Sequence, residues 1–422
     1  MWSHLLRRGL SVAMSGRPAA LQVDTEQFEA LFTDGLKQIA ELFSKHHYEL
    51  RIAGGAVRDL LSGKQPQDVD FATTASPQQM KEMLSSANIR MINAIGEKHG
   101  TITARVCEQN FEITTLRVDV LTDGRHAKVE FTKDWAMDAE RRDLTINSMF
   151  LDLDGNLYDY FNGLQDLQNK RVRFVGDPEK RIQEDYLRIL RYFRFYGMVA
   201  ADLEQHEEKT LLAIQENARG LAKIAGERIW LEVKKTLLGN HVSHLLSLVY
   251  SLGVAPYIGL PVSSLEEMLI VCERSLNLQP KPMTILSALF QNQEDVRKLD
   301  LRLKISREEK NLALFLLKHR RDMHPGDEKD PLEPYKDLIN QSRDPLIRER
   351  TYELLKYQGE RNLLSDLQGW TVPCFPISGH DLRVRGITSG KEIGIELQRL
   401  RQLWKQSGYT ADKETLLENV CR

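Results

Sequence analysis

The segment GGAVRDLLSGKQPQDVDFATTA, residues 54–75, places a glycine pair between a predicted strand and a predicted short helix. The apolar pattern predicts the strand over residues 48–53. Gly54 and Gly55 would let backbone N–H groups approach a phosphate closely, at a helix N-terminus that favours negative charge. Arg58, one helical turn later, would add its guanidinium to the same anion. The segment therefore predicts a phosphate-binding turn.

Two aspartates follow on the next predicted strand, over residues 68–73. Because side chains alternate along a strand, Asp68 and Asp70 would share one face and Val69 would take the other. Neighbouring carboxylates repel unless a cation lies between them, and their hard oxygen atoms suit Mg²⁺, the usual partner of a nucleoside triphosphate. Glu112 in FEITTLR is a candidate third metal ligand, although a solvent-exposed strand residue would give the same pattern. Together the glycine turn and the aspartate pair predict a nucleotide site with bound metal.

The rest of the chain divides into a mixed α/β part and a helical part. Residues 28–165 alternate predicted helices, the first over 28–45, with short strands. From residue 178 onward apolar residues recur at three- and four-residue spacing, which predicts helices. We therefore expect an α+β fold, with a small mixed sheet and helices followed by an elongated all-helical remainder. The expected parts are a lead-in (1–27), a head (28–165), a helical neck (166–240), a helical body (241–335) and a helical tail (336–422).

Composition excludes several classes of protein. The 422 residues are 41% hydrophobic and 28% charged, with a formal net charge of −2, and no apolar run approaches the ~20 residues of a membrane helix. The four cysteines are scattered without a CxxC pair, which argues against a disulfide framework or a structural zinc site and for a reducing compartment. Basic residues are enriched only locally, in 170–194 and in 382–406. Any polyanion-binding surface must therefore be local.

The N-terminal segment MWSHLLRRGLSVAMSGRPAALQV contains three arginines, three serines and no acid before Asp24. Its basic, amphipathic character is typical of a mitochondrial targeting segment, although a disordered tail would have a similar composition. An internal start at Met14 would remove most of the segment and produce an additional cytosolic or nuclear pool. The segment is left out of the fold argument.

The segment EDYLRILRYFRF, residues 184–195, is predicted as one helix with charges at every third position. These charges are Asp185, Arg188, Arg191 and Arg194. They would spread around half of the helix instead of forming one water-facing stripe. A surface ion pair between the acid and the first arginine would leave the other two arginines unexplained.

These elements together resemble the class II CCA-adding enzymes, which belong to the polymerase-β-like nucleotidyltransferases. A further matching element is RRDLTIN, residues 141–147, and the closest likeness is to the animal mitochondrial and cytosolic type. The resemblance implies that Arg142 meets a triphosphate and that Asp143 meets the ribose hydroxyls. Without the resemblance, these two residues would be read as an exposed helix start.

The resemblance also implies the reaction, which is template-independent addition of C, C and A to the 3′ end of tRNA from CTP and ATP. Asp68 and Asp70 would hold two Mg²⁺ ions. One ion would lower the pKa of the RNA 3′-hydroxyl, which attacks the α-phosphate, and the other would neutralise the β,γ-phosphates and the leaving pyrophosphate.

The chemistry of the bases gives Asp185 and Arg188 a role beyond phosphate binding. Cytosine and adenine each present an amino donor beside a ring acceptor, whereas uracil and guanine present a carbonyl acceptor beside an N–H donor. A carboxylate only accepts and a guanidinium only donates, so the pair complements C and A and opposes U and G. At i and i+3 of one helix the two side chains would be neighbours. In the family that this chain resembles, the arginines that follow support the triphosphate or the helix framework.

The C-terminal segment ISGHDLRVRGITSGKEIG, residues 377–394, places glycines among basic residues. It resembles the tail element with which these enzymes grip the upper half of tRNA, while the acceptor end enters the head. Helices that simply pack on their neighbours are the alternative.

Two other functions fit parts of the pattern. A bacterial-type poly(A) polymerase shares the head and neck, but it carries a basic stretch where this chain has GEKHGT, residues 96–101. A non-catalytic RNA-binding relative is less favoured, because it would have no need for the carboxylates of Asp68 and Asp70. The sequence leaves the oligomeric state open, a homodimer included.

Overall fold

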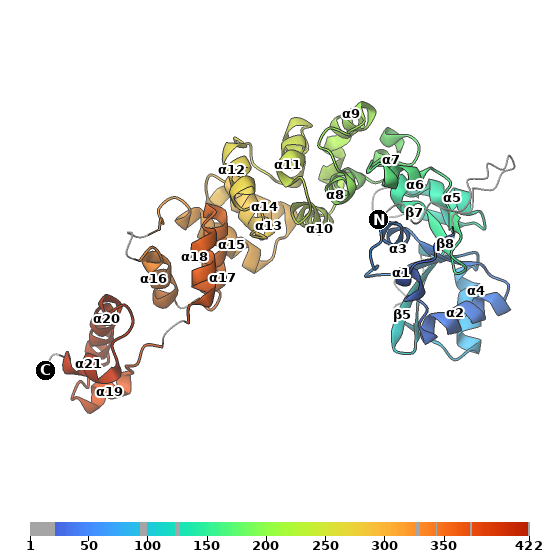
Figure 1. Cartoon of the computed structure of the whole chain (residues 1–422). Helices are drawn as coiled ribbons and strands as arrows, with labels where there is room; N and C mark the ends of the chain where they lie inside the picture. Colours follow the sequence, from blue (N-terminus) through green and yellow to red (C-terminus); the bar gives the residue numbers. More distant parts are fainter. Residues whose placement is uncertain are drawn as a thin grey trace. The chain divides into compact units, whose positions relative to one another are not determined.

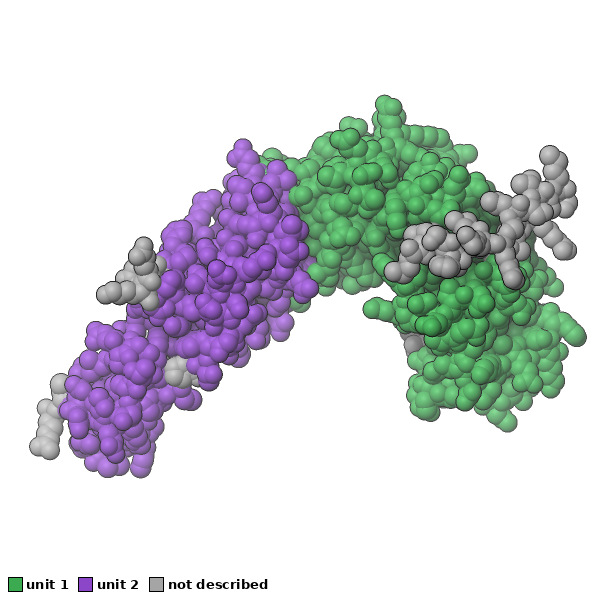
Figure 2. Space-filling model, in the orientation of Figure 1, with its two compact units in different colours: residues 1–265, 294–306 green, residues 266–293, 307–422 purple. Residues whose placement is uncertain are grey.

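The computed structural model of the chain describes residues 22–92, 99–122, 127–325, 330–342, 344–371 and 374–420. It forms two compact units, residues 1–265 with 294–306 and residues 266–293 with 307–422 (Figure 2). Most of the predicted targeting segment, Met14 included, lies outside the described residues, and so does half of GEKHGT. In the described part of the chain, no helix combines the length and the apolar character that a membrane span needs.

The first unit is built on a seven-stranded mixed sheet with strand order β3-β4-β5-β2-β1-β8-β9. Strands β5 and β8 of this sheet are labelled in Figure 1. The strands are β1 (Leu50–Ala53), β2 (Asp70–Thr73), β3 (Arg90–Ile92), β4 (Thr101–Val106), β5 (Gln109–Thr115), β8 (Phe150–Asp152) and β9 (Leu157–Tyr158). Strands β2 and β5 run parallel, and the other described neighbours are antiparallel. A separate hairpin joins β6 (Arg117–Thr122) to β7 (Ala127–Phe131). The predicted α+β class with a small mixed sheet is confirmed.

Helices make up most of the remaining chain. The first unit contains α1 (Glu26–Glu29), α2 (Asp34–Lys45), α3 (Gly55–Leu61), α4 (Pro77–Ser86), α5 (Trp135–Glu140), α6 (Gly163–Gln168), α7 (Pro178–Glu184), α8 (Arg188–Val199), α9 (Glu208–Asn217), α10 (Gly226–Leu237), α11 (Val242–Ser251) and most of α14 (Gln293–Leu303). The second contains α12 (Glu266–Arg274), α13 (Pro282–Leu286), α15 (Arg307–His319), α16 (Glu333–Gln341), α17 (Ile347–Gln358), α18 (Arg361–Gly369), α19 (Gly379–Val384), α20 (Gly390–Gln406) and α21 (Lys413–Glu418).

Two of the predicted elements have different boundaries from those expected. The helix expected over residues 28–45 is divided into α1 and α2, because Thr33 caps the second helix by accepting a hydrogen bond from the Leu36 N–H. The strand expected to begin at Asp68 begins at Asp70, and Asp68 lies in the bend before it. The two aspartates are therefore not held by one regular strand.

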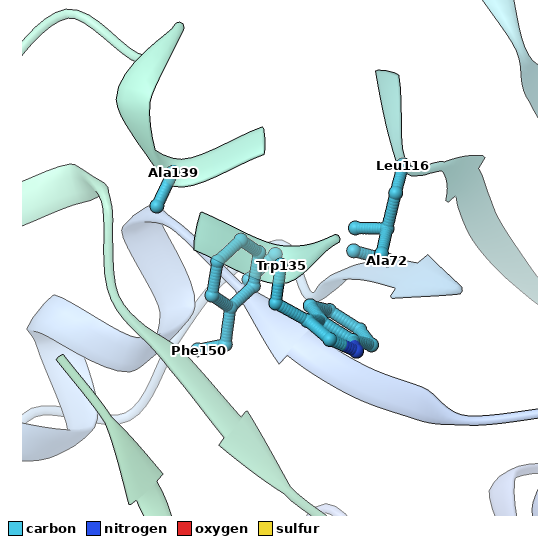
Figure 3. Packing of buried hydrophobic residues seen from close by; sticks show 6 residues of the cluster. Ala72, Leu116, Trp135, Ala139 and Phe150 are labelled. Carbon is cyan, nitrogen blue, oxygen red and sulfur yellow. The ribbon is translucent and has the colours of Figure 1, made fainter. Parts of the chain in front are cut away.

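A hydrophobic cluster ties α5 to the ends of strands β1 and β2 (Figure 3). It consists of Ala53, Ala72, Leu116, Trp135, Ala139 and Phe150. The Trp135 ring meets the Phe150 ring edge to face, with centroids 4.9 Å apart. Because truncating a buried tryptophan typically costs about 3–5 kcal/mol, this packing is a major support of the fold. The cluster fixes the chain that follows α5 against the strand ends, where the predicted site residues lie.

The C-terminal helices of the second unit share a small core of their own. Residues from α19, α20 and α21 form it, and the Trp404 ring packs against Phe375 and Tyr409. Ser378 caps α19 through its hydroxyl, and Asp381 completes the capping box by accepting from the Ser378 N–H. The predicted basic tail is thus a packed helical module.

A row of three hydrogen-bonded rings, Tyr192, His206 and His244, joins the loop between α8 and α9 to α11. The Tyr192 hydroxyl lies 2.8 Å from Nδ1 of His206, and Nε2 of His206 lies 2.9 Å from Nε2 of His244. Burial, and then the charge of His244, lowers the pKa of His206 from 6.5 to about 4. Because the pKa of His206 is lower in the folded chain than in the unfolded chain, the folded state favours the neutral imidazole ring.

The melting temperature is therefore expected to fall as the pH is lowered from 6.5 towards 4, because the unfolded chain binds a proton that folded His206 resists. Replacing His206 with glutamine should lower the melting temperature at pH 7.5 and make it less dependent on pH in this window. Replacing the exposed His46 with glutamine should leave the pH dependence unchanged. Thermal denaturation from pH 4 to 8 checks this, and parallel curves for the wild type and the His206 variant would contradict it.

Candidate active site

One cavity of about 1270 Å³ in the first unit collects every side chain predicted for the site. Its lining includes Gly54, Gly55, Arg58, Asp68, Asp70, Glu112, Arg142, Asp143, Asp185, Arg188, Arg191 and Arg194. These residues come from the turn between β1 and α3, from α3, from the start of β2 and the bend before it, and from the middle of β5. The others come from the chain after α5, from the segment joining α7 to α8 and from α8. Elements far apart in the sequence therefore contribute to one site.

The glycine turn lies where β1 ends and α3 begins. Gly54 has φ +66° and ψ −119°, a conformation that side chains with a Cβ rarely adopt. A Cβ built there would lie 3.0 Å from Nη1 of Arg142, so the position is also crowded. Arg58 is 7% exposed and donates to the Asn147 side-chain oxygen at 2.6 Å and to Asp59 at 2.8 Å. The turn thus brings two guanidinium groups next to the backbone at the end of β1.

The three predicted carboxylates are neighbours at the edge of the cavity. Asp70 of β2 lies directly opposite Glu112 of β5 in the parallel register, and both side chains are exposed. Although the Asp70 residue retains accessible surface, its carboxyl group is partly desolvated by the protein around it, which raises its pKa. The charges of Glu112 and Asp68 raise this pKa further, against the opposing effect of Arg142. Three like charges therefore crowd one place, and a cation there would remove the repulsion.

The carboxylates do not form a ready-made cage. Within the described ranges, no three His, Cys, Asp or Glu side chains are already arranged as ligands around one point. Hard carboxylate oxygens that repel one another nevertheless suit Mg²⁺, which keeps several waters and takes further ligands from substrate phosphates. The residues present fit a metal bound together with a nucleotide.

After α5, Asp143 is buried and Arg142 is half-buried, and the reading as an exposed helix start is wrong for them. The Arg142 guanidinium donates to Asp138 at 3.1 Å, and its Cζ lies 4.7 Å from the centre of the Phe150 ring. Asp143 accepts from Nε of Arg191 at 2.5 Å and from the backbone N–H of Leu144 at 2.8 Å. Although burial alone would raise it, these neighbours hold the pKa of Asp143 below its ordinary value. Asp143 therefore stays ionised.

The single helix expected over residues 184–195 is interrupted, and this prediction is wrong. Helix α7 ends at Glu184, Asp185 has an extended backbone (φ −151°, ψ 105°), and α8 begins at Arg188. The Asp185 carboxylate accepts from the backbone N–H of Leu187 at 3.1 Å, so the acid terminates one helix and supports the start of the next. Asp185 and Arg188 are therefore not neighbours on one helix face.

The two proposed base-reading side chains have other partners in this structure. The second carboxylate oxygen of Asp185 accepts from Nη2 of Arg228 at 2.9 Å. Arg188 donates to Glu184 at 2.5 Å and to the Arg141 backbone oxygen at 2.9 Å. Both side chains still line the cavity, in orientations fixed by these partners.

Several cavity residues were missed by the sequence analysis. They are Asn147, Arg228 and Glu232, of which Arg228 was visible in GERI without an assigned role, and Glu184 contacts the cavity residue Arg188 from outside the lining. Glu232 lies 2.9 Å from Arg194 and 4.0 Å from Arg191, and Asn147 accepts from Arg58. Each acts as a counter-charge or hydrogen-bond partner, a role that a sequence motif does not reveal.

Two family models match the chain. The Poly A polymerase head domain covers residues 50–173, and the probable RNA and SrmB-binding site of polymerase A covers residues 205–261. The chain is 64% identical to the mitochondrial CCA tRNA nucleotidyltransferase 1 of Danio rerio and 62% identical to that of Homo sapiens. Each match covers 95% of this chain and 93% of the relative.

Solved structures show the same fold. The CCA-adding enzyme of Bacillus stearothermophilus in complex with CTP superposes with a TM-score of 0.73 at 24% identity, covering 91% of this chain and 94% of that one. The Thermotoga maritima CCA-adding enzyme complexed with tRNA gives a TM-score of 0.66 at 19% identity, covering 94% and 97%.

Proposed function

The chain belongs to the family of CCA tRNA nucleotidyltransferases, and on that premise we propose that it adds C, C and A to the 3′ end of tRNA without a template. It is an enzyme of the nucleotidyltransferase class, and CTP and ATP are the proposed substrates. The observation that carries the proposal is the likeness to the fish and human enzymes along nearly the whole chain. The convergence of twelve predicted site residues on one cavity supports it independently.

The proposed chemistry places the triphosphate between the glycine turn and the arginines. The backbone N–H of Gly55, with Arg58 and Arg142, would bind the phosphates, and Gly54, whose own N–H donates to the Met149 carbonyl at 3.2 Å, would provide the turn. Asp68 and Asp70 would hold two Mg²⁺ ions, and Glu112 is the further carboxylate beside them. When bound, the ions would lower the pKa of the RNA 3′-hydroxyl and neutralise the departing pyrophosphate.

Other cavity residues would position the nucleoside. Asp143 is buried and ionised, so it can accept from ribose hydroxyls. Asp185 and Arg188 would read the edge of the base, and Arg228 and Glu184 orient them. Arg191 and Arg194, which line the same cavity, would support the triphosphate.

The remaining assignments are also proposals. We assign the head to residues 28–165, the neck to 166–240, the body to 241–335 and the tRNA-binding tail to 336–422. The names of the relatives favour a mitochondrial location, and a start at Met14 would add a cytosolic or nuclear pool.

Purified protein given Mg²⁺, CTP and ATP is expected to extend a tRNA that lacks its 3′ terminus by three nucleotides and then stop. CTP alone should give two additions, and chelating the Mg²⁺ with EDTA should abolish extension. Sequencing-gel resolution of the products with each nucleotide singly and together checks this. Open-ended addition of A to unrelated RNAs would support a poly(A) polymerase instead, and no extension under any mixture would contradict both activities.

A further inference from the structure

Phe195 is a buried aromatic residue on α8 with three guanidinium groups around its ring. It is 5% exposed and lines the cavity. The Cζ atoms of Arg58, Arg191 and Arg194 lie 5.0, 5.4 and 4.2 Å from the ring centre. All three distances are within the range of about 6 Å over which an aromatic face attracts a cation. One of these arginines comes from α3 and two from α8, so a single ring joins both sides of the cavity.

Three cations this close repel one another. Burial lowers the pKa of Arg194, and the charges of Arg191 and Arg58 lower it further, while Glu232 opposes the shift. Each guanidinium also contacts a carboxylate: Asp59 at 2.8 Å from Arg58, Asp143 at 2.5 Å from Arg191, and Glu232 at 2.9 Å from Arg194, with Glu232 also 4.0 Å from Arg191. Arg58 donates from Nε and Nη2 to Asp59 and from Nη1 to Asn147, whereas Arg191 donates from Nε to Asp143 and Arg194 from Nη1 to Glu232. The ring attracts the three groups without any charge of its own.

This arrangement differs from one made of ion pairs alone. A fourth carboxylate in the place of the ring would hold the arginines but would neutralise charge that an anionic ligand needs. The ring quadrupole adds attraction without net charge, so the guanidiniums stay close together and remain available to phosphate oxygens.

We propose that Phe195 is a positioning residue for the triphosphate, an aromatic platform that keeps Arg58, Arg191 and Arg194 together as one phosphate-binding surface. The proposal rests on the proposed function, because it takes the polyphosphate of CTP or ATP as the ligand. Phe195 acts through the arginines and does not itself touch the reacting atoms.

Replacing Phe195 with leucine retains an apolar side chain but removes the ring. The KM for CTP is expected to rise about 10- to 30-fold, since three attractions of moderate strength are lost, while kcat changes less than about 3-fold. Phe195→Tyr, which retains the ring, should restore KM to within about 3-fold of wild type. The matched control is Phe193→Leu, because Phe193 is equally buried on the same helix and its ring contacts Tyr192. That control should leave KM unchanged.

Equilibrium binding separates this role from a purely structural one. The affinity of Phe195→Leu should fall about 10-fold for CTP but less than about 3-fold for CMP, which carries one phosphate. Equal KM values for the Phe195 and Phe193 leucine variants, or equal losses for CTP and CMP, would overturn the proposal. If the wild-type protein neither bound CTP nor extended tRNA, the proposed function itself would fail, whatever the variants did.

Discussion

Asp70→Asn is expected to lower the rate constant of nucleotide addition by about 10³-fold or more while the protein stays folded. The substitution keeps the shape of the side chain and removes one of the two charges proposed to hold Mg²⁺. Since Asp70 is crowded by Glu112 and Asp68, its negative charge opposes folding in the absence of metal. The melting temperature measured without metal should therefore be unchanged or slightly higher.

A large loss of activity without a loss of thermal stability distinguishes a metal-binding role from a structural one. Single-turnover extension of a tRNA that lacks its terminal A, with ATP and Mg²⁺ in excess, measures the rate constant. Asp24→Asn serves as the control, because Asp24 is an exposed carboxylate outside the cavity. A rate within about 10-fold of wild type for the Asp70 variant would refute its assignment as a metal ligand.

The parts of the site that the sequence predicted well are local in the chain. The glycine turn between β1 and α3 and the Asp70 strand follow from short-range geometry, because glycine conformation and side-chain alternation act over a few residues. Asp68 shows the limit of that reasoning. Its spacing from Asp70 suited one strand, but the strand pairs begin at Asp70, opposite Ala53 and Glu112.

The break at Asp185 could not be seen in the pattern of residues 184–195. Leu187 keeps helical dihedral angles (φ −61°, ψ −22°), so apolar residues continue at nearly the same spacing through the interruption. Asp185 has an extended backbone, and its carboxylate accepts hydrogen bonds from the Leu187 N–H and from Arg228. An interruption this short leaves the periodicity almost unchanged, although it reorients the side chain that we propose to read the base.

The ion pairs of the site required the folded structure. Arg228 reaches Asp185 across 43 residues, and Arg191 reaches Asp143 across 48. The sequence shows which residues are charged but not which of them pair in the folded chain. It therefore suggested only the i, i+3 pair of Asp185 and Arg188. In the folded chain α8 packs against α10, which carries Arg228, and Asp185 pairs with Arg228 instead.

The structure changes the way in which Asp185 and Arg188 would select a base under the proposed function. Each is already held by a protein partner, Asp185 by Arg228 and Arg188 by Glu184. These partners restrict the rotamers of the two side chains before a nucleotide enters. Nucleotide binding would therefore cost less side-chain entropy. A base with the wrong donor and acceptor pattern would face a carboxylate and a guanidinium that cannot rotate to relieve the mismatch.

Replacing Asp185 with alanine is therefore expected to weaken discrimination between CTP and UTP by about 10- to 100-fold, since one unmatched buried polar contact costs about 1–3 kcal/mol. Without the carboxylate, the carbonyl oxygen of uracil no longer faces a negative charge, and the released Arg228 guanidinium can donate to it. The triphosphate contacts remain, so binding of CTP should weaken but persist. Competition between CTP and UTP in primer extension measures the ratio of kcat/KM values.

Asp177→Ala provides the control, because Asp177 caps the start of α7 outside the cavity and its loss should lower stability without altering base choice. An Asp185 variant that retained the wild-type ratio would show that the base is read elsewhere.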